Sequence, residues 1–117
     1  MRNDLDEKLC ATFPELFAER TLDPTVSAMG RGFECGDGWF PLLMGLCNSV
    51  SLAVECLDMP AVRVLQVKEK LGCLRFRFSG GNSMTLGMVR LAENLSTKID
   101  PETGEWLSDL EEHGVRK

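Results

Sequence analysis

The chain has 117 residues, of which 44% are hydrophobic and 26% charged, as expected for one globular domain over residues 1–117. The 18 acidic residues outnumber the 13 basic ones, and the net charge of −5 excludes a protein that binds nucleic acid through its whole surface. No apolar run approaches the roughly 20 residues of a membrane span, and the charged start MRNDLDEKLC lacks the apolar core of a signal peptide, so we expect a cytoplasmic protein.

The first predicted element is a helix over residues 4–20. Asp4 and Asp6 suit the positive end of a helix dipole. Pro14 removes a backbone donor inside this segment and favours a break into two short helices. Apolar residues spaced by three and four form one predicted face: Leu5, Leu9, Phe13, Leu16 and Phe17.

A second helix is predicted over residues 39–57, after a glycine-rich loop over 21–38. The repeated glycines of the loop indicate positive φ angles or close backbone approach. Asp37 is the expected N-cap, Pro41 fits the first turn, and Pro60 follows the end of the helix. Its predicted apolar stripe comprises Trp39, Leu42, Leu43, Leu46, Val50, Val54 and Leu57.

A β-hairpin is predicted over residues 62–69 and 73–79, with a tight turn around Lys70–Gly72. An even loop would pair Val67 with Leu74 and Leu65 with Phe76. The predicted apolar face carries Leu65, Val67, Leu74, Phe76 and Phe78. The predicted polar face carries Val62, Val64, Gln66, Lys68, Cys73, Arg75 and Arg77.

A third helix is predicted over residues 83–98, capped by Asn82 or Ser83. Its expected core-facing stripe comprises Met84, Met88, Leu91, Ala92, Leu95 and Ile99. After a turn at DPETG, a last short helix is expected to direct Trp106, Leu107 and Leu110 inward. The predicted fold is therefore α+β, a small antiparallel β-hairpin or sheet packed against two to four helices.

The sequence shows no arrangement typical of a catalytic, cofactor or metal site. His113 is the only histidine, and the glycine-rich loop matches neither a P-loop nor a dinucleotide fingerprint. The thiols form no C-x-x-C pair, so we expect no zinc, no cofactor and reduced, mostly buried cysteines. They are Cys10, Cys35, Cys47, Cys56 and Cys73.

Charge is segregated along the second half of the chain, which predicts two candidate binding surfaces. The basic hairpin face comprises Lys68, Lys70, Arg75 and Arg77 and could bind phosphate or an acidic partner. The acidic C-terminal segment includes Glu102, Glu105, Asp109, Glu111 and Glu112 and could meet a basic partner. The alternative is that both are solvated faces that contact each other.

Three stretches, CGDGWFPLLMGLC, LQVKEKLGCLRF and AENLS, resemble a group of small uncharacterised bacteriophage and prophage proteins. Their shared pattern runs G-W-x-x-L, then Q-V-K-E-K-x-G-x-L-R-F, then A-E-x-x-S. In many relatives the last helix leads into cysteines that form a small zinc-binding end. Here Ile99 or Asp100, Thr103 and Leu110 stand near cysteine positions, while Gly104, Trp106 and His113 remain. The resemblance therefore implies a version without the metal, in which Trp106 packs in its place.

Together these features favour a phage- or prophage-encoded binding protein that is not an enzyme. Its expected partner is a bacterial host protein such as a component of a defence complex, which would make it an anti-defence inhibitor of the anti-CRISPR kind. The first alternative is a nucleic-acid-binding module that uses the basic hairpin face, and the second is a small hydrolase or thiol enzyme. We expect no membrane partner, while an exposed strand edge could pair two copies into a homodimer.

Overall fold

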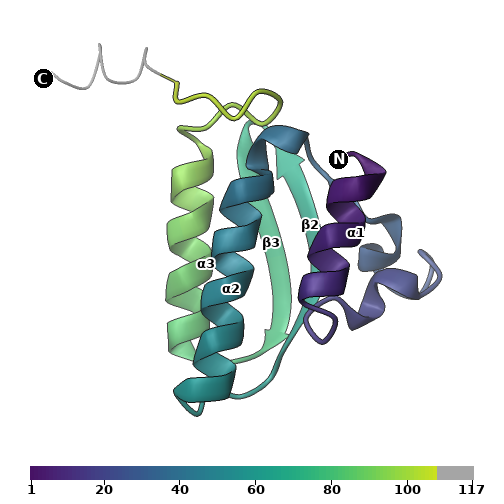
Figure 1. Cartoon of the computed structure of the whole chain (residues 1–117), viewed down its shortest axis with the longest axis vertical. Coiled ribbons are helices and arrows are strands. Elements are labelled where there is room, and N and C mark those ends of the chain that lie inside the picture. The colour runs from purple at the N-terminus through teal and green to yellow at the C-terminus, as the bar shows by residue number, and fades with distance from the viewer. Residues whose placement is uncertain (108–117) are drawn as a thin grey trace, which may run out of the picture.

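The computed structural model describes residues 1–107, which form an α+β domain as the sequence predicts (Figure 1). The strands form one mixed sheet in the order β1-β2-β3. The α-helices are α1 (Asn3–Thr12), α2 (Phe40–Cys56) and α3 (Ser83–Ser96). The strands are β1 (Phe33–Glu34), β2 (Val62–Lys70) and β3 (Cys73–Gly80). Short 3-10 turns occupy Ala18–Thr21, Ala28–Arg31 and Asp37–Trp39.

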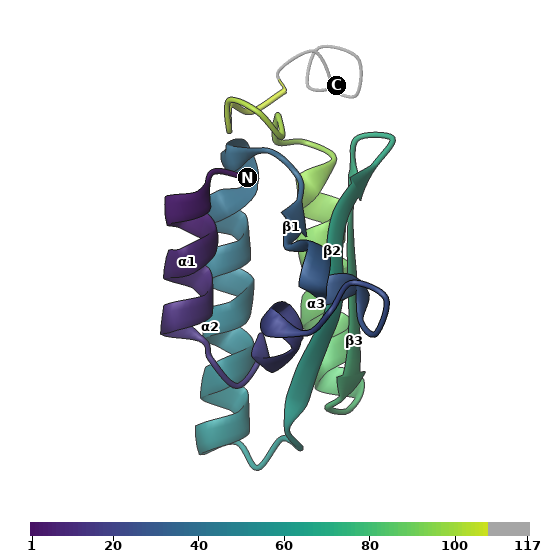
Figure 2. The ribbon, with the colours of Figure 1, turned by 90° about the vertical axis from the view of Figure 1, so that its right-hand side faces the viewer.

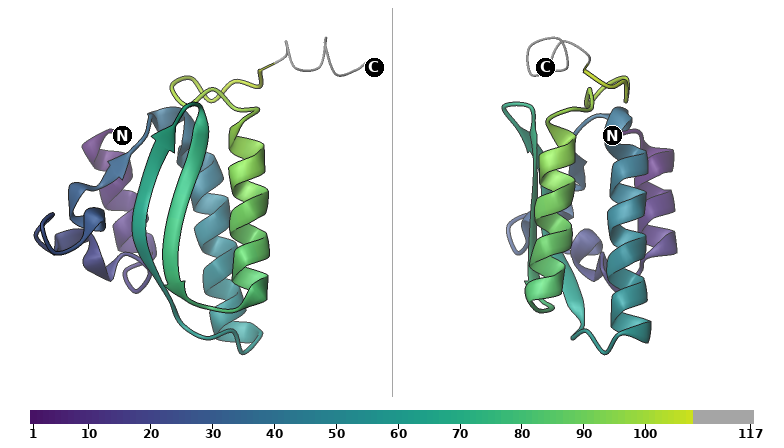
Figure 3. Two further views of the ribbon diagram at one scale, coloured as in Figure 1. Left: turned by 180° about the vertical axis from the view of Figure 1, so that it is seen from behind. Right: turned by 90° about the vertical axis from the view of Figure 1, so that its left-hand side faces the viewer.

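The helices lie on one side of the sheet and leave its other face open. In Figure 2, α1 and α2 form a layer that faces the inner side of the sheet. In Figure 3, α3 lies along the β3 edge and beside α2, and the view from behind shows no helix crossing the outer face of the hairpin. The core therefore lies between α2 and the sheet, and α3 closes one side.

The predicted helix over 4–20 is shorter in the structure, because α1 ends at Thr12, two residues before Pro14. The chain after Pro14 continues in turns, so the expected break is found but a second α-helix is not. The apolar residues of this segment still reach the core: Leu9, Phe13, Leu16 and Phe17 are buried. The Phe17 ring meets Phe33 edge-on, with centroids 5.0 Å apart.

Helix α2 begins at Phe40 with Pro41 in its first turn, as predicted. The expected N-cap is wrong, because Asp37 lies in the preceding 3-10 turn and its carboxylate accepts a hydrogen bond from the Arg2 amide at 2.8 Å. The central residues of the predicted apolar stripe are buried, as expected, but Leu57 at its end is 61% exposed. The residues of α2 that are buried are Leu43, Leu46, Cys47, Val50 and Ala53.

The hairpin turn is Leu71–Gly72, and both residues have positive φ, 54° and 80°. Two such residues form the type I′ geometry that matches the twist of paired strands. Val67 consequently pairs with Phe76 rather than Leu74, a shift of two residues that preserves the faces near the turn. An irregularity between Val64 and Gln66 then moves Val64 to the inner side. The predicted outward placement of Val62 and Val64 is therefore wrong.

Strand β1 was not predicted, since it is two residues long and lies within the glycine-rich loop. It pairs in parallel with β2, through Phe33 to Val67 and Glu34 to Lys68. The same loop approaches the segment over residues 100–104 closely, because the Gly38 amide donates to the Pro101 carbonyl at 2.8 Å. A Cβ at Gly38 would lie 2.4 Å from the Asp100 carbonyl oxygen, so this position requires glycine.

Helix α3 starts at the predicted cap, because the Asn82 side chain accepts from the Met84 amide and Thr85 completes a capping box. Its core face is not the predicted one. The helix turns Thr85, Val89, Ala92 and Ser96 inward, whereas the exposed fractions of Met84, Leu91 and Leu95 are 41%, 62% and 36%. Three of the six residues of the expected stripe therefore lie at the surface, while Ala92 is buried and Met88 and Ile99 are partly buried against the core.

Two side chains of α3 cover the outer edge of β3. The Leu74 amide donates to Ser96 Oγ at 2.9 Å, and the Phe76 amide donates to Glu93 Oε2 at 3.1 Å. On the other edge, β2 pairs with β1, and the Val64 amide donates to the Leu16 carbonyl at 2.9 Å. Several edge positions of the hairpin are thus occupied by groups from the same chain.

The two tryptophans have different environments. Trp39 is fully buried, and its Nε1 donates to the Ile99 carbonyl at 2.9 Å. Trp106 forms an isolated bridge with Ile99 but remains 48% exposed, so the prediction that it points inward is wrong. Leu107 is half-buried, and Leu110 and His113 lie outside the described residues.

Candidate functional site

The structure places all members of the basic hairpin face on the open side of the sheet. Lys70, Arg75 and Arg77 are exposed and Lys68 is half-buried. Alternation along β3 directs Arg75 and Arg77 outward while Leu74 and Phe76 enter the core. The pairing of Lys68 with Arg75 and of Gln66 with Arg77 brings side chains from both strands together on this face.

Lys68 and Arg75 are like charges placed directly opposite each other, an arrangement that opposes strand pairing. Arg77 is oriented by Gln66, whose Oε1 accepts from its Nε at 3.1 Å. Within residues 1–107, no carboxylate lies within 4.0 Å of Lys68, Lys70, Arg75 or Arg77. The four cations are therefore available to groups outside this part of the chain.

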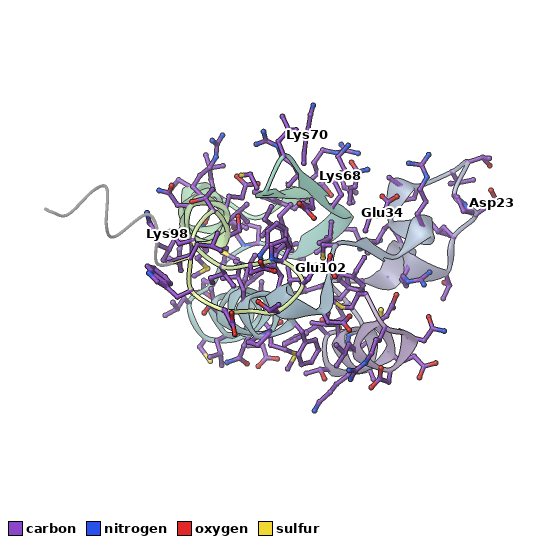
Figure 4. The ribbon with its side chains drawn as sticks, turned by 90° about the horizontal axis from the view of Figure 1, so that it is seen from above. Asp23, Glu34, Lys68, Lys70, Lys98 and Glu102 are labelled. Carbon is purple, nitrogen blue, oxygen red and sulfur yellow. The ribbon has the colours of Figure 1, made fainter. Side chains whose placement is uncertain are left out.

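The basic hairpin face also borders an acidic side chain. Glu34 is the pairing partner of Lys68 across the parallel ladder, whereas Glu69 pairs with Leu74 and so alternates to the other face of the hairpin. In Figure 4, Lys68 and Lys70 project away from the body of the molecule, with Glu34 to one side of Lys68. The surface is thus a cationic patch with an acidic margin rather than a continuous positive stripe.

Only the first part of the acidic C-terminal segment lies within the described residues. Asp100 folds its own turn, because its carboxylate accepts from the Glu102 and Thr103 amides at 2.8 Å and 3.0 Å. These bonds, with Thr103 contributing most, lower the pKa of Asp100. Glu102 and Glu105 are exposed, and Figure 4 shows Glu102 over the end of the molecule, apart from Lys68 and Lys70. Asp109, Glu111 and Glu112 lie outside the described residues.

The two predicted charged surfaces do not neutralise each other through the residues that the structure describes. The ion pairs found there join Arg2 to Asp4 and Asp37, Arg20 to Asp6, and Arg63 to Glu19. The most enclosed of them is structural: Arg20 binds the Asp6 carboxylate at 3.1 Å and donates to the Gly30 carbonyl at 3.2 Å. This ion pair connects α1 to the loop that leads into β1.

Cys10, Cys35 and Cys47 lack the environment of an activated nucleophile. Burial raises the pKa of Cys10 and of Cys35 to about 11, and the nearby Asp6 carboxylate adds to the effect at Cys10. Burial likewise raises the pKa of Cys47 to about 12. A reactive thiol needs its pKa lowered by cations or a helix N-terminus, so these shifts have the opposite direction. Among residues 1–107, no three potential metal ligands cluster.

A surface that the sequence reasoning missed is a groove between α2 and α3, with a volume of about 330 Å³. Leu42, Gly45 and Ser49 line it from α2, and Met88, Leu91 and Leu95 line it from α3. The apolar stripe of α3 was the available signal, and it was assigned to the core because apolar residues at helical spacing usually are. We call this surface the α2–α3 groove.

A larger hollow, of about 440 Å³, lies where the end of α1 meets α2 and the start of β2. It includes the carboxylates of Glu15 and Glu55 with Asn48 and Ser51, but none of the predicted site residues. Asp37–Cys56, which contains α2, is long and apolar enough to cross a membrane by length and composition, with mean hydropathy 1.3. Its buried side chains belong to the core of the domain, a pattern typical of a central helix in a globular protein.

Comparison of the chain with protein-family models, with curated proteins and with solved structures finds no match.

Proposed function

We propose that this is a non-enzymatic binding protein that docks its basic hairpin face on an acidic surface of another protein. The single observation that supports this most is the directly opposed pair of Lys68 and Arg75 on a rigid, open sheet face. Like charges in this position cost the sheet about 0.2–1 kcal/mol. A local conflict that the fold does not need is typical of a functional surface.

A protein partner fits this face better than a nucleic acid. Readers of single strands stack bases on aromatic rings. Phe76 is buried and Phe78 alternates to the same side, while the outward positions of β3 carry Arg75 and Arg77. A polyanion would also meet Glu34 at the margin and a chain of net charge −5. Mixed charges with a positive centre suit a complementary protein surface, where such patterns determine specificity and association rate.

The setting follows from the resemblance to bacteriophage and prophage proteins. The partner would then be a host protein in the bacterial cytoplasm, and inhibition of a defence complex, in the anti-CRISPR manner, is the specific form that we propose. The compact domain is consistent with a soluble protein. Binding of nucleic acid by the same four cations is the alternative function, and the open, cationic sheet is the observation that favours it.

The test is affinity capture with crosslinking from a bacterial lysate, followed by mass spectrometry. The wild type is compared with Arg75→Glu plus Arg77→Glu, and with a matched control of equal charge change, Lys8→Glu plus Arg31→Glu. Both control residues are exposed and lie outside the sheet. We expect the wild type and the control to enrich the same host protein and the hairpin variant to lose it.

Equal loss in both variants, or no reproducible partner for the wild type, would contradict the proposal. In parallel, fluorescence anisotropy measures binding to duplex DNA and to single-stranded RNA at low salt. Binding with a log–log salt slope of about −0.9 per phosphate contact, lost only in the hairpin variant, would support the nucleic-acid function instead.

A further inference from the structure

Helix α3 presents an apolar seam that the rest of the described chain covers only in part. Met84, Met88, Leu91 and Leu95 follow one another at spacings of four, three and four, the pattern by which one helix packs lengthwise against another. Leu91 is 62% exposed and Met84 is 41% exposed. The sheet is contacted through a different face of α3, which includes the buried residues Thr85 and Ser96.

The surface around this seam is almost free of charge. The 17 residues of α2 and the 14 residues of α3 include only Glu55, Arg90 and Glu93 as charged residues. Glu93 is already engaged with the Phe76 amide at the β3 edge. None of the three lines the α2–α3 groove. A partner that covers this groove must therefore present an uncharged apolar surface, and two copies of this chain would bring no charged side chains of the groove lining into direct contact here.

The same patch contains both a ridge and a hollow. Leu91 and Leu95 stand on the α3 side, while Gly45 and Ser49 line the α2 side with small side chains. A Cβ added at Gly45 would meet no atom within 4 Å, so space is open above this turn of α2. A two-fold symmetric contact requires a patch that fits itself, and a ridge beside a hollow meets this requirement.

We propose that a second copy of this chain covers the α2–α3 groove and forms a symmetric dimer. The ridge of each copy enters the hollow of the other, and the two helix pairs form a four-helix layer. The inference is independent of the proposed binding function, because the basic hairpin face lies on β2 and β3, on the side of the sheet that no helix crosses (Figure 3).

The size of the surface predicts a weak dimer. A helix of 14 residues is about 21 Å long, and paired helices lie about 8–10 Å apart. A face of about 20 Å by 20 Å buries about 400 Å² on each copy, or about 800 Å² in total, which is below the roughly 1,000 Å² of a stable interface and in the range of a weak, transient contact. We therefore expect dissociation in the micromolar range, so the experiment must span it.

The test is sedimentation velocity from about 1 µM to about 300 µM, a range that brackets micromolar dissociation. We expect the mass of the wild type to rise from 13.0 kDa toward twice that value as concentration increases. Gly45→Leu fills the hollow without striking the helix's surroundings, and it should raise the thermal midpoint while weakening dimerisation about tenfold or more. Leu91→Glu places a charge in the seam and should have an equal or larger effect.

The matched control is Leu57→Glu, since Leu57 is 61% exposed and does not line the groove. It should leave dimerisation within about twofold of the wild type. A wild type that remains at 13.0 kDa throughout, or a dimer that tolerates both Gly45→Leu and Leu91→Glu, would overturn the proposal. Binding of the wild-type monomer to phosphatidylcholine vesicles that is lost in Leu91→Glu would overturn it as well, because a lipid surface would then occupy the groove.

Discussion

The outer sheet face and the α2–α3 face of this domain differ in how sequence relates to exposure. On β3, strict alternation buries Leu74 and Phe76 and exposes Arg75 and Arg77, so hydrophobicity and burial agree. On α3, polar Thr85 and Ser96 are fully buried while Leu91 is exposed. An apolar stripe on a helix therefore indicates that this face makes a contact, but it does not show whether the contact is with the core or with another molecule. A polar residue can occupy the core when its hydrogen bonds are made.

The largest loss of stability is expected at Trp39, whose ring joins the start of α2 to Ile99, beyond the end of α3. Trp39→Ala removes a fully buried ring and its bond to the Ile99 carbonyl, and should lower the free energy of unfolding by about 3–5 kcal/mol. Trp106→Ala, at a half-exposed position, should cost less than about 1 kcal/mol. Urea denaturation measures both, and equal losses would show that the C-terminal segment is packed as tightly as α2.

A smaller effect is expected at the contact that joins α3 to the sheet. Ser96→Ala leaves the buried Leu74 amide without its acceptor and should destabilise the protein by about 1–3 kcal/mol. Thr97→Ala is the control, since Thr97 is exposed and its hydroxyl bonds only to the Asn94 carbonyl of its own helix turn. If Ser96→Ala and Thr97→Ala have the same free energy of unfolding, the polar residues on the inner side of α3 do not determine its orientation.

The smallest expected change in the free energy of unfolding is a gain in stability instead of a loss. Arg75→Glu replaces a like-charged pair across the strands with an attractive pair to Lys68 and should stabilise the hairpin by about 0.2–1 kcal/mol. The gain should shrink as salt is added, because exposed charges are screened. Thermal unfolding at low and high salt measures it, with Arg31→Glu as the control. Destabilisation by Arg75→Glu at low salt would remove the conflict on which the proposed binding face depends.

The sequence was sufficient to predict α2, the hairpin and α3 to within a few residues, because proline, the asparagine cap and strong periodicity define their limits. It was not sufficient for β1, whose two residues pair with Val67 and Lys68 far along the chain. The irregularity beside Leu65 also escaped prediction, and the tight turn expected around Lys70–Gly72 has a register that differs by two residues, since many short loops are compatible with the same alternation.

Of the candidate sites, the sequence placed the basic hairpin face correctly on one side of the sheet, because alternation alone determines that geometry. The α2–α3 groove could not be separated from the core, because Met84, Leu91 and Leu95 have the spacing that a buried face would have. Only the hydrogen bonds of Ser96 and Thr85 show which side of α3 turns inward, and these depend on Leu74 and Met59 from other elements.

The side chains of α3 that bond to the outer edge of β3 affect the order in which the parts of the chain can fold. The amides of Leu74 and Phe76 find their acceptors on Ser96 and Glu93, which follow the hairpin in the chain. During synthesis the hairpin therefore emerges before the helix that protects it, and its edge is open to other nascent chains until α3 has formed. The final turns of α3 thus complete the fold and also end the period in which this protein is most exposed to aggregation.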